Sequence, residues 1–205
     1  MYRYALTIEY DGSPFHGWQL QSNITTVQGV VFDAIKKLDM NCENFVGAGR
    51  TDAGVHAIGQ VAHVDLATKR DCETVQKAIN YYLNKYPVSI LNARFVNKQF
   101  HARFSAIKRH YIYKIFSRKA DLTFEKNQYW HVRHSLNKSN MQLAANYLTG
   151  RHDFSAFRSS ICQASSPIKT IDTISIQSEE IRDGVVYQLN FSARSFLHHQ
   201  VRSIV

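Results

Sequence analysis

Two hydrophobic periods follow one another along the first half of the chain, and their order constrains the fold more than any other sequence feature. Apolar and polar residues alternate over 3–10, which predicts a strand with one buried face. Apolar residues then recur at helical spacing over 27–38, after Thr25-Thr26-Val27-Gln28, which resembles a capping box. The same reasoning predicts strands near 45–46, 60–66 and 89–96, and a helix that begins after Asp71. The predicted order is βαββαβ, an α+β arrangement with a mainly antiparallel sheet and helices packed on it.

The second half starts the same order again. The expected elements are a strand over 110–116, a helix capped by Ser139-x-x-Gln142 and ended by Gly150, strands over 170–176 and 185–193, and a helix from Phe196. This second unit is expected to lack the end of its closing helix and a final strand at Val205. Because no linker rich in Pro, Gly or Ser separates the halves, we expect one domain over 1–205 with lobes at about 1–105 and about 106–205.

Basic residues outnumber acidic ones, with 25 Lys and Arg against 16 Asp and Glu and a net charge of +9. The stretch 74–120 contains no Asp or Glu, while cations and aromatic residues are interleaved along it. Attraction to phosphates combined with stacking on bases is the usual way in which looped or single-stranded RNA is bound. The stretch therefore favours an RNA-binding surface over an ordinary solvated basic face. The cations are Lys77, Lys85, Arg94, Lys98, Arg103, Lys108, Arg109, Lys114, Arg118 and Lys119, and the aromatic residues interleaved with them from position 95 onward are Phe95, Phe100, Phe104, Tyr111, Tyr113 and Phe116.

Several classes of protein are excluded by the sequence. No apolar run is long enough to span a membrane, and the N-terminus enters a predicted strand directly, so the chain is expected to be cytoplasmic with no membrane partner. The cysteines Cys42, Cys72 and Cys162 are odd in number and widely spaced, which predicts neither a disulfide framework nor a zinc cluster.

The segment between the two middle strands of the first half, Gly47-Ala48-Gly49-Arg50-Thr51-Asp52-Ala53-Gly54-Val55-His56, is the most distinctive motif. It lacks the Lys-Ser/Thr pair of a P-loop, and Asp52 stands where a dinucleotide fingerprint needs its last glycine. The chain also lacks the signatures of zinc deaminases and of α/β-hydrolases. His198 and His199 are adjacent and would point in different directions on a helix, which argues against a metal site there.

Gly47–Ala57 resembles the signature of the tRNA pseudouridine synthase A family, in which the Asp is the catalytic nucleophile. Further segments resemble the family in the same order, so the resemblance covers essentially the whole chain. Gln200 departs from it, since an apolar Met is expected there, a change expected to have little consequence. The further segments are Tyr10-Asp11-Gly12 with Phe15–Gln19, Phe100–Ala106 running into Arg109–Tyr113, Asp153–Arg158, and Ser195–Arg202.

The resemblance implies the pseudouridine synthase fold and the isomerisation of uridine to pseudouridine at tRNA positions 38, 39 and 40, in the anticodon stem-loop. It implies Asp52 as nucleophile, Arg202 as its ion-pair partner, Arg50 as the wedge in place of the flipped nucleotide, and Tyr111 stacked on the target uracil. The resemblance implies that no metal or cofactor is needed. It also implies that the protein forms a homodimer. Candidate RNA contacts are Arg103, Lys108, Arg109, Lys114 and Arg158.

Two other functions stay open at this point. A βαββαβ unit with strand aromatics and a basic surface also resembles a non-catalytic RNA-recognition module, although such a module leaves Arg50-Thr51-Asp52 unexplained. An inactive relative that acts as an RNA chaperone is the second alternative. For Tyr113, packing in the core is the preferred interpretation.

Overall fold

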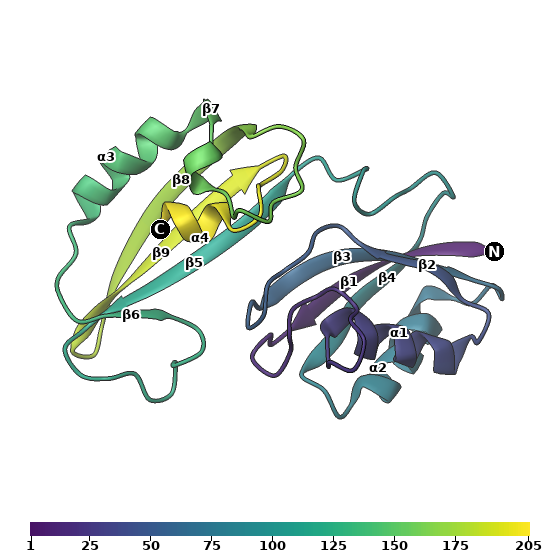
Figure 1. Cartoon of the computed structure of the whole chain (residues 1–205). Helices are drawn as coiled ribbons and strands as arrows, with labels where there is room; N and C mark the ends of the chain where they lie inside the picture. Colours follow the sequence, from purple (N-terminus) through teal and green to yellow (C-terminus); the bar gives the residue numbers. More distant parts are fainter. The chain divides into compact units, whose positions relative to one another are not determined.

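The computed structural model describes residues 1–205, which form two compact units, Met1–Ala106 and Ile107–Val205. Figure 1 shows the elements of both units. In chain order the first unit contains β1 (Tyr2–Tyr10), α1 (Val27–Leu38), β2 (Glu43–Gly47), β3 (Ala57–Leu66), α2 (Cys72–Leu83) and β4 (Val88–Phe95).

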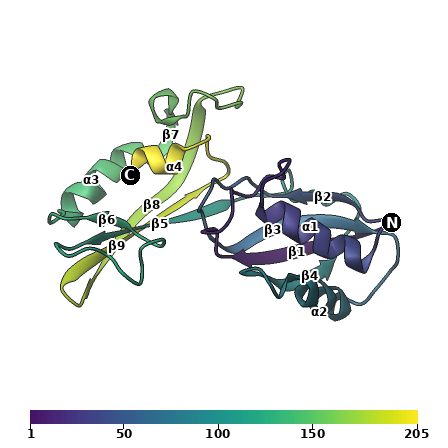
Figure 2. The same ribbon diagram turned by 60° about the horizontal axis from the view of Figure 1, so that its bottom comes forward.

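The first unit has the predicted order βαββαβ. Its strands form one antiparallel sheet with the order β2-β3-β1-β4, so β1 lies between β3 and β4. Every second residue of β1 from Tyr4 to Tyr10 is buried in a core that also contains the apolar stripes of α1 and α2. Figure 2 shows these helices beside the sheet, and sharing one core places both on its same face.

The N-terminal capping residue predicted from the sequence is confirmed for α2 and is wrong for α1. Asp71 accepts a hydrogen bond from the N–H of Thr74 at 2.8 Å and caps α2, as predicted. The predicted capping box at α1 is wrong by one residue, because Thr26 accepts from the N–H of Gly29. Gln28 instead accepts from the N–H of Leu20, so its amide joins the loop before α1 to the helix.

The loop 97–105 lies against the sheet through two polar side chains of the strands. The guanidinium of Arg3 donates to the carbonyl oxygens of Lys98 and Phe100 at 2.7 and 2.8 Å, and it also forms a two-pronged ion pair with Asp65. Nδ1 of His63, which is 1% exposed, accepts from the backbone N–H of Ala102 at 3.1 Å. Side chains of β1 and β3 thus fix this loop.

His63 is held in its neutral form. Burial, followed by the nearby positive charge of Arg3, lowers its pKa from 6.5 to about 4. The hydrogen bonds from Arg3 also lower the pKa of Asp65, which keeps that carboxyl group ionised. A neutral Nδ1 without a proton is the state that can accept from Ala102.

Acid should therefore destabilise the chain partly through His63. Between pH 6.5 and 4 the unfolded residue binds a proton that the folded residue does not, so the stability contributed by neutral His63 is complete above pH 6.5 and is lost as the pH falls through this window. His63→Gln keeps an acceptor for Ala102 but does not titrate. Its free energy of unfolding should depend less on pH than that of the parent, by up to about 1.4 kcal/mol per pH unit. Urea denaturation across this range measures the difference, and parallel pH profiles would contradict it.

The second unit adds short elements that the sequence did not predict. In chain order it contains β5 (Arg109–Ser117), β6 (Trp130–Val132), α3 (Lys138–Leu148), β7 (Gly150–Asp153), a 3₁₀ turn η1 (Ser155–Phe157), β8 (Ile168–Ile181), β9 (Gly184–Ala193) and α4 (Gln200–Ile204). The strands β6 and β7 are corrections to the expected order, and β8 is longer than predicted.

The central strands of the second unit repeat the topology of the first. The sheet order is β6-β5-β9-β8-β7, so β8, β9 and β5 neighbour one another as β2, β3 and β1 do. The strand β6 lies beside β5 in the position that corresponds to β4 beside β1. The two pairings differ in direction, because β6 is parallel to β5 and β4 is antiparallel to β1. The antiparallel pairing of β5, β9 and β8 confirms the expected α+β, mainly antiparallel unit, while β6 and β7 depart from the predicted order.

The helix α3 is capped differently from the prediction. Asn137, not Ser139, accepts from the N–H of Asn140 at 3.0 Å. The amide of Gln142 reaches β8 instead, where it donates to the carbonyl oxygen of Ile174 and accepts from the N–H of Ile176. Gly150 follows the helix with φ +105°, the left-handed conformation expected at a helix stop.

Two further observations concern the helices and the thiols. No helix has the length and apolar character that crossing a membrane requires. The three cysteines are free; Cys42 is buried, and burial raises the pKa of its thiol.

Candidate active site

The loop between β2 and β3 carries Asp52, and a second sequence motif holds this loop in place. The backbone N–H of Trp18 donates to the carbonyl oxygen of Thr51 at 3.0 Å, and the Thr51 and Tyr10 hydroxyls are hydrogen-bonded at 2.9 Å. Trp18 itself is 2% exposed and packs against the rings of Tyr10 and Phe45. The family signature 47–57 and the further family segment 10–19 therefore lie in contact within the first unit.

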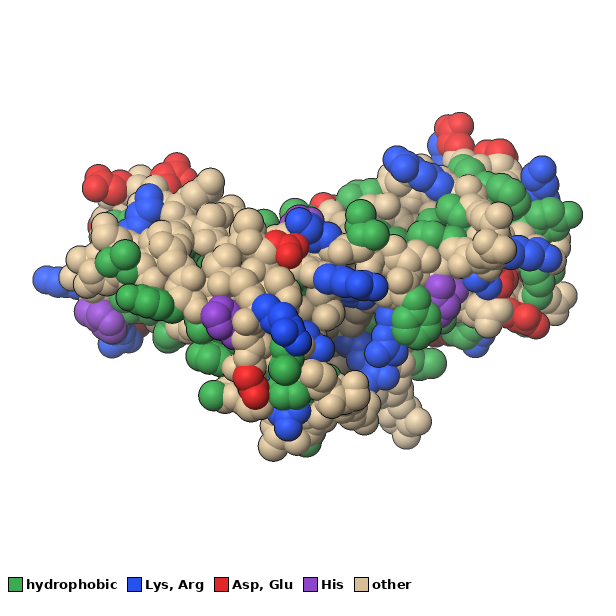
Figure 3. All heavy atoms as spheres, turned by 90° about the horizontal axis from the view of Figure 1, so that it is seen from above, with side chains coloured by type: hydrophobic (Ala, Val, Ile, Leu, Met, Phe, Trp, Pro, Cys, Tyr) green, Lys and Arg blue, Asp and Glu red, His purple; other side chains and the backbone are tan.

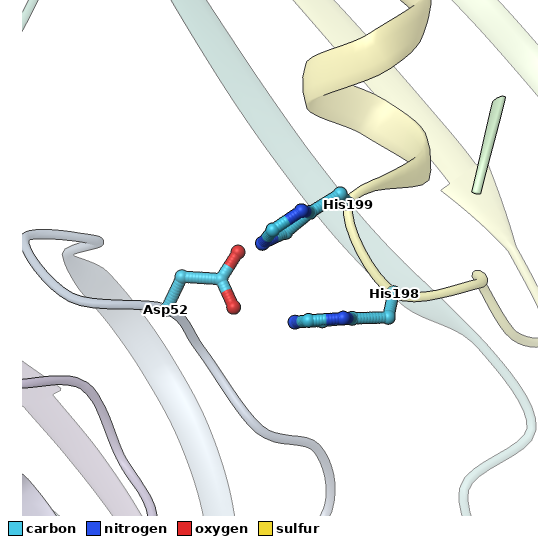
Figure 4. Close-up of side chains that lie close together, drawn as sticks. All are labelled: Asp52, His198 and His199. Atoms are coloured by element: carbon cyan, nitrogen blue, oxygen red, sulfur yellow. The ribbon is translucent and has the colours of Figure 1, made fainter. Parts of the chain in front are cut away.

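Backbone hydrogen bonds also shape the loop on both sides of Asp52. Its carbonyl oxygen accepts from the N–H of Val55 at 3.2 Å, which closes a turn. Earlier in the loop, the amide of Gln60 donates to the carbonyl oxygen of Gly49 at 2.7 Å. Figure 4 shows the half-buried carboxylate of Asp52 projecting from this loop, while Arg50 is exposed two residues before it. Asp52 thus has a fixed backbone on either side.

Gly17 allows the two segments to approach each other. Its φ of +87° is in the left-handed region, and a Cβ atom there would lie 2.7 Å from the carbonyl oxygen of Thr51. Gly17→Ala should therefore displace the backbone next to Asp52. A displacement of about 1 Å near reacting groups costs on the order of 100-fold in rate, so we expect a loss of that size in turnover.

The matched control for this substitution is Gly59→Ala in β3. A Cβ atom at Gly59 would meet no heavy atom closer than 4.0 Å, so turnover and melting temperature should stay near those of the parent. Turnover by Gly17→Ala equal to that of Gly59→Ala would show that the contact with Thr51 does not position the loop.

Tyr111 lies near the start of β5 in the second unit. Its half-buried ring meets the ring of Phe196 edge to face at 5.2 Å, and its backbone pairs with Phe191. Tyr113 is on the same face of the strand and is also half-buried against the core of this unit. The sequence predicted core packing for Tyr113. In the structure both tyrosines pack partly against the core of the second unit and are partly exposed.

The segment before α4 contradicts the expected orientation of its two histidines. His198 and His199 precede the helix, and His199 has φ +64°, so their rings do not diverge but lie 4.0 Å apart (Figure 4). The carbonyl oxygen of His198 accepts from the N–H of Ser159 at 3.0 Å. The family segments 153–158 and 195–202 accordingly lie together in this unit.

Gln200, the departure from the family pattern, has a structural role. Its Oε1 accepts from the N–H of Leu197 at 2.7 Å, and the residue is 1% exposed. An amide here closes the turn into α4, which an apolar side chain does not do. The expectation that this change has little consequence is therefore wrong for the hydrogen bonding of the turn. Arg202, two residues further on, is exposed on α4.

The stretch 74–120 contains no acidic residue, but acidic side chains from elsewhere in the chain pair with several of its cations. Lys77 pairs with Glu73, Lys108 pairs with Asp172 at 3.1 Å, and the guanidinium of Arg118 contacts Asp183 and two backbone carbonyls. Phe116, at 1% exposure, is a core residue and not part of a binding surface. On the face in Figure 3, Lys and Arg side chains are spread over both units, and several adjoin exposed apolar side chains.

The candidate RNA contacts differ in their surroundings. Arg103 and Arg158 are exposed, and Lys108 is engaged with Asp172. Arg109 donates to the carbonyl oxygen of Arg194, and the ammonium group of Lys114 lies 5.5 Å from the ring centre of Tyr129.

Comparisons with known proteins agree with these motifs. The chain matches the family model described as tRNA pseudouridine synthase over residues 6–105 and 144–205. A tRNA pseudouridine synthase A from Maricaulis maris (strain MCS10) is 50% identical over 205 residues, which are all of this chain and 81% of that protein. Proteins of the same name from Cereibacter sphaeroides (strain KD131 / KCTC 12085) and Paracoccus denitrificans (strain Pd 1222) are 47% and 49% identical, each matching all of this chain and 80% of its own length.

A solved structure adds only a distant likeness. The crystal structure of a Cbf5-Nop10-Gar1 complex aligns at a TM-score of 0.41 and 13% identity, covering 97% of this chain and 43% of the matched chain, which is too weak to bear on function. The family model and the relatives are decisive: the chain belongs to the tRNA pseudouridine synthase family, whose members are isomerases.

Proposed function

We propose that the chain converts uridine to pseudouridine at positions 38, 39 and 40 in the anticodon stem-loop of tRNA. The family membership supports the reaction, and the observation that carries it to this chain is the loop that presents Asp52, held at Thr51 by Tyr10 and Trp18. The tRNA positions 38, 39 and 40 are those that the resemblance of the sequence motifs to the family implies.

The reaction is an isomerisation. The bond from N1 of uracil to C1′ of the ribose breaks, the base turns, and a bond from C5 to C1′ forms. The hydrogen on C5 leaves as a proton, and N1 takes up a proton. Because no electrons are gained or lost overall, the chemistry needs an anion, a proton acceptor and a site for the base, which protein side chains supply.

We assign the roles as the resemblance implies. Asp52 is the nucleophile or assists proton removal from the ribose, and Arg202 is its ion-pair partner. Arg50 takes the space of the flipped nucleotide, and Tyr111 stacks on the uracil. The RNA backbone is contacted by Arg103, Lys108, Arg109, Lys114 and Arg158. We further propose that the single catalytic domain forms a homodimer and acts in the cytoplasm.

Site-specific modification tests this proposal. A tRNA transcript should be prepared in three versions that each keep one uridine, at position 38, 39 or 40, within an anticodon stem-loop otherwise free of uridine. The chain should form pseudouridine in each version, detected by a reverse-transcription stop after carbodiimide treatment. A fourth transcript with its uridine elsewhere in the stem-loop should stay unmodified. Modification of the fourth transcript alone would contradict the assigned positions, and modification of none would contradict the reaction.

A further inference from the structure

The aromatic residues of the stretch 74–120 are not equally available to a ligand. Phe116 is buried, and Phe100, Tyr111 and Tyr113 are half-buried. Among the six aromatic residues over 95–120, Phe104 is the most exposed at 72%, followed by Phe95 at 53%; Tyr81, on α2 and outside this group, is 71% exposed. Phe104 lies in the first unit, on the loop 97–105 that Arg3 and His63 fix to the sheet.

One face of the Phe104 ring is supported by other rings. The buried ring of His63 lies 4.8 Å from the ring of His101, and the ring of His101 lies 4.4 Å from that of Phe104 with planes inclined by 33°. Nδ1 of His101 also accepts from the backbone N–H of Phe104 at 3.4 Å. Three rings thus lead from the interior to the surface, and the last of them is largely exposed.

A cation accompanies this exposed ring. The guanidinium carbon of the exposed Arg103 lies 5.6 Å from the ring centre of Phe104. An exposed aromatic face that is fixed in place needs little ordering when a flat ligand stacks on it. A ring beside a cation suits a ligand with a planar base and a nearby phosphate, and such stacking requires no particular base.

We propose that Phe104 is a stacking platform for an unpaired nucleobase of the RNA substrate, and that Arg103 binds the adjoining phosphate. The inference relies on the proposed function only in taking RNA as the ligand. It depends neither on positions 38, 39 and 40 nor on the role of Asp52.

Substitution of Phe104 tests the proposal through the affinity for a tRNA transcript, measured by fluorescence anisotropy at fixed salt. Phe104→Leu should raise the dissociation constant about 5- to 140-fold, the range that corresponds to losing one base stack. Phe104→Trp should bind as tightly as the parent, and its added indole fluorescence should be quenched when RNA binds. The matched control is Tyr81→Leu on α2, where the ring is 71% exposed, and its dissociation constant should stay within about twofold of the parent.

The salt dependence separates the two residues. Because stacking releases no counterions, Phe104→Leu should keep the slope of log K against log salt. Arg103→Gln should reduce that slope by about 0.7, the value for one phosphate of a single strand. Thermal unfolding monitored by circular dichroism shows whether each variant is folded.

Affinity of a folded Phe104→Leu equal to that of the parent, or an equal loss in Tyr81→Leu, would overturn the proposal. So would fluorescence of Phe104→Trp that does not change with RNA. Failure of the proposed function is a separate result, because it appears as absence of pseudouridine formation by the parent chain, whatever the affinities of these variants.

Discussion

Asp52→Asn should lower pseudouridine formation more than about 1000-fold while the affinity for tRNA stays near that of the parent. Asparagine has nearly the same shape as aspartate but cannot act as an anionic nucleophile, and removal of a nucleophile typically costs several powers of ten in turnover. Binding energy comes mainly from cations and aromatic faces elsewhere on the chain. Single-turnover assays with excess enzyme measure the chemical step apart from binding.

The matched control for this substitution is Asp33→Asn, which removes one negative charge from the exposed surface of α1. Its turnover should equal that of the parent. Residual activity of Asp52→Asn within tenfold of the parent would contradict the assignment of the nucleophile. Lost binding in a folded Asp52→Asn would instead place Asp52 in substrate recognition.

Tyr111→Phe should turn over at least about 100-fold more slowly than the parent and bind tRNA nearly as well. Our hypothesis is that the Tyr111 hydroxyl accepts the proton from C5, and general-base catalysis typically supplies about 10²–10⁴ in rate. The phenyl ring keeps both the stacking face and the edge-to-face contact with Phe196. Tyr111→Leu removes ring and hydroxyl together, so it should also bind tRNA more weakly, by about 1–3 kcal/mol.

Tyr113→Phe is the matched control, since Tyr113 is half-buried on the same face of β5. It should retain full turnover. If Tyr111→Phe also retained full turnover, the hydroxyl would have no catalytic role, and another group or water would take the proton.

Hydrophobic spacing predicted the elements of the first unit well, because β1, α1 and α2 bury apolar residues at regular strand or helix spacing. The cap positions were less predictable. Apolar spacing locates a helix to within a residue or two, and the tertiary partners of Gln28 and Gln142 decide that Thr26 and Asn137 are the caps.

The short strands of the second unit carry no periodic signal. The strand β6 covers only Trp130–Val132 and exists because its backbone pairs with β5. The four residues of β7 include none that is buried, so alternation could not reveal them. Pairing between segments distant in sequence creates both strands.

The sequence motifs of the candidate site were predictable, but the side chains that hold its neighbouring loop in place were not. Arg3, His63 and Asp65 lie within strands, where the pattern alone shows polar residues facing away from the helices. Only the structure shows that they hold the loop 97–105. Charge was misleading for the same reason, since Asp172 lies far from Lys108 in sequence and pairs with it in space.

Release of tritium from tRNA that carries 5-tritiated uridine reports the proposed isomerisation itself, because joining C5 to the ribose must expel the hydrogen on C5. The parent chain should release tritium in proportion to the pseudouridine formed, without added metal or cofactor, and Asp52→Asn should release it no faster than a blank without enzyme. Tight binding of tRNA by the parent with no release above the blank would contradict the account and leave the chain as an RNA-binding protein without this activity.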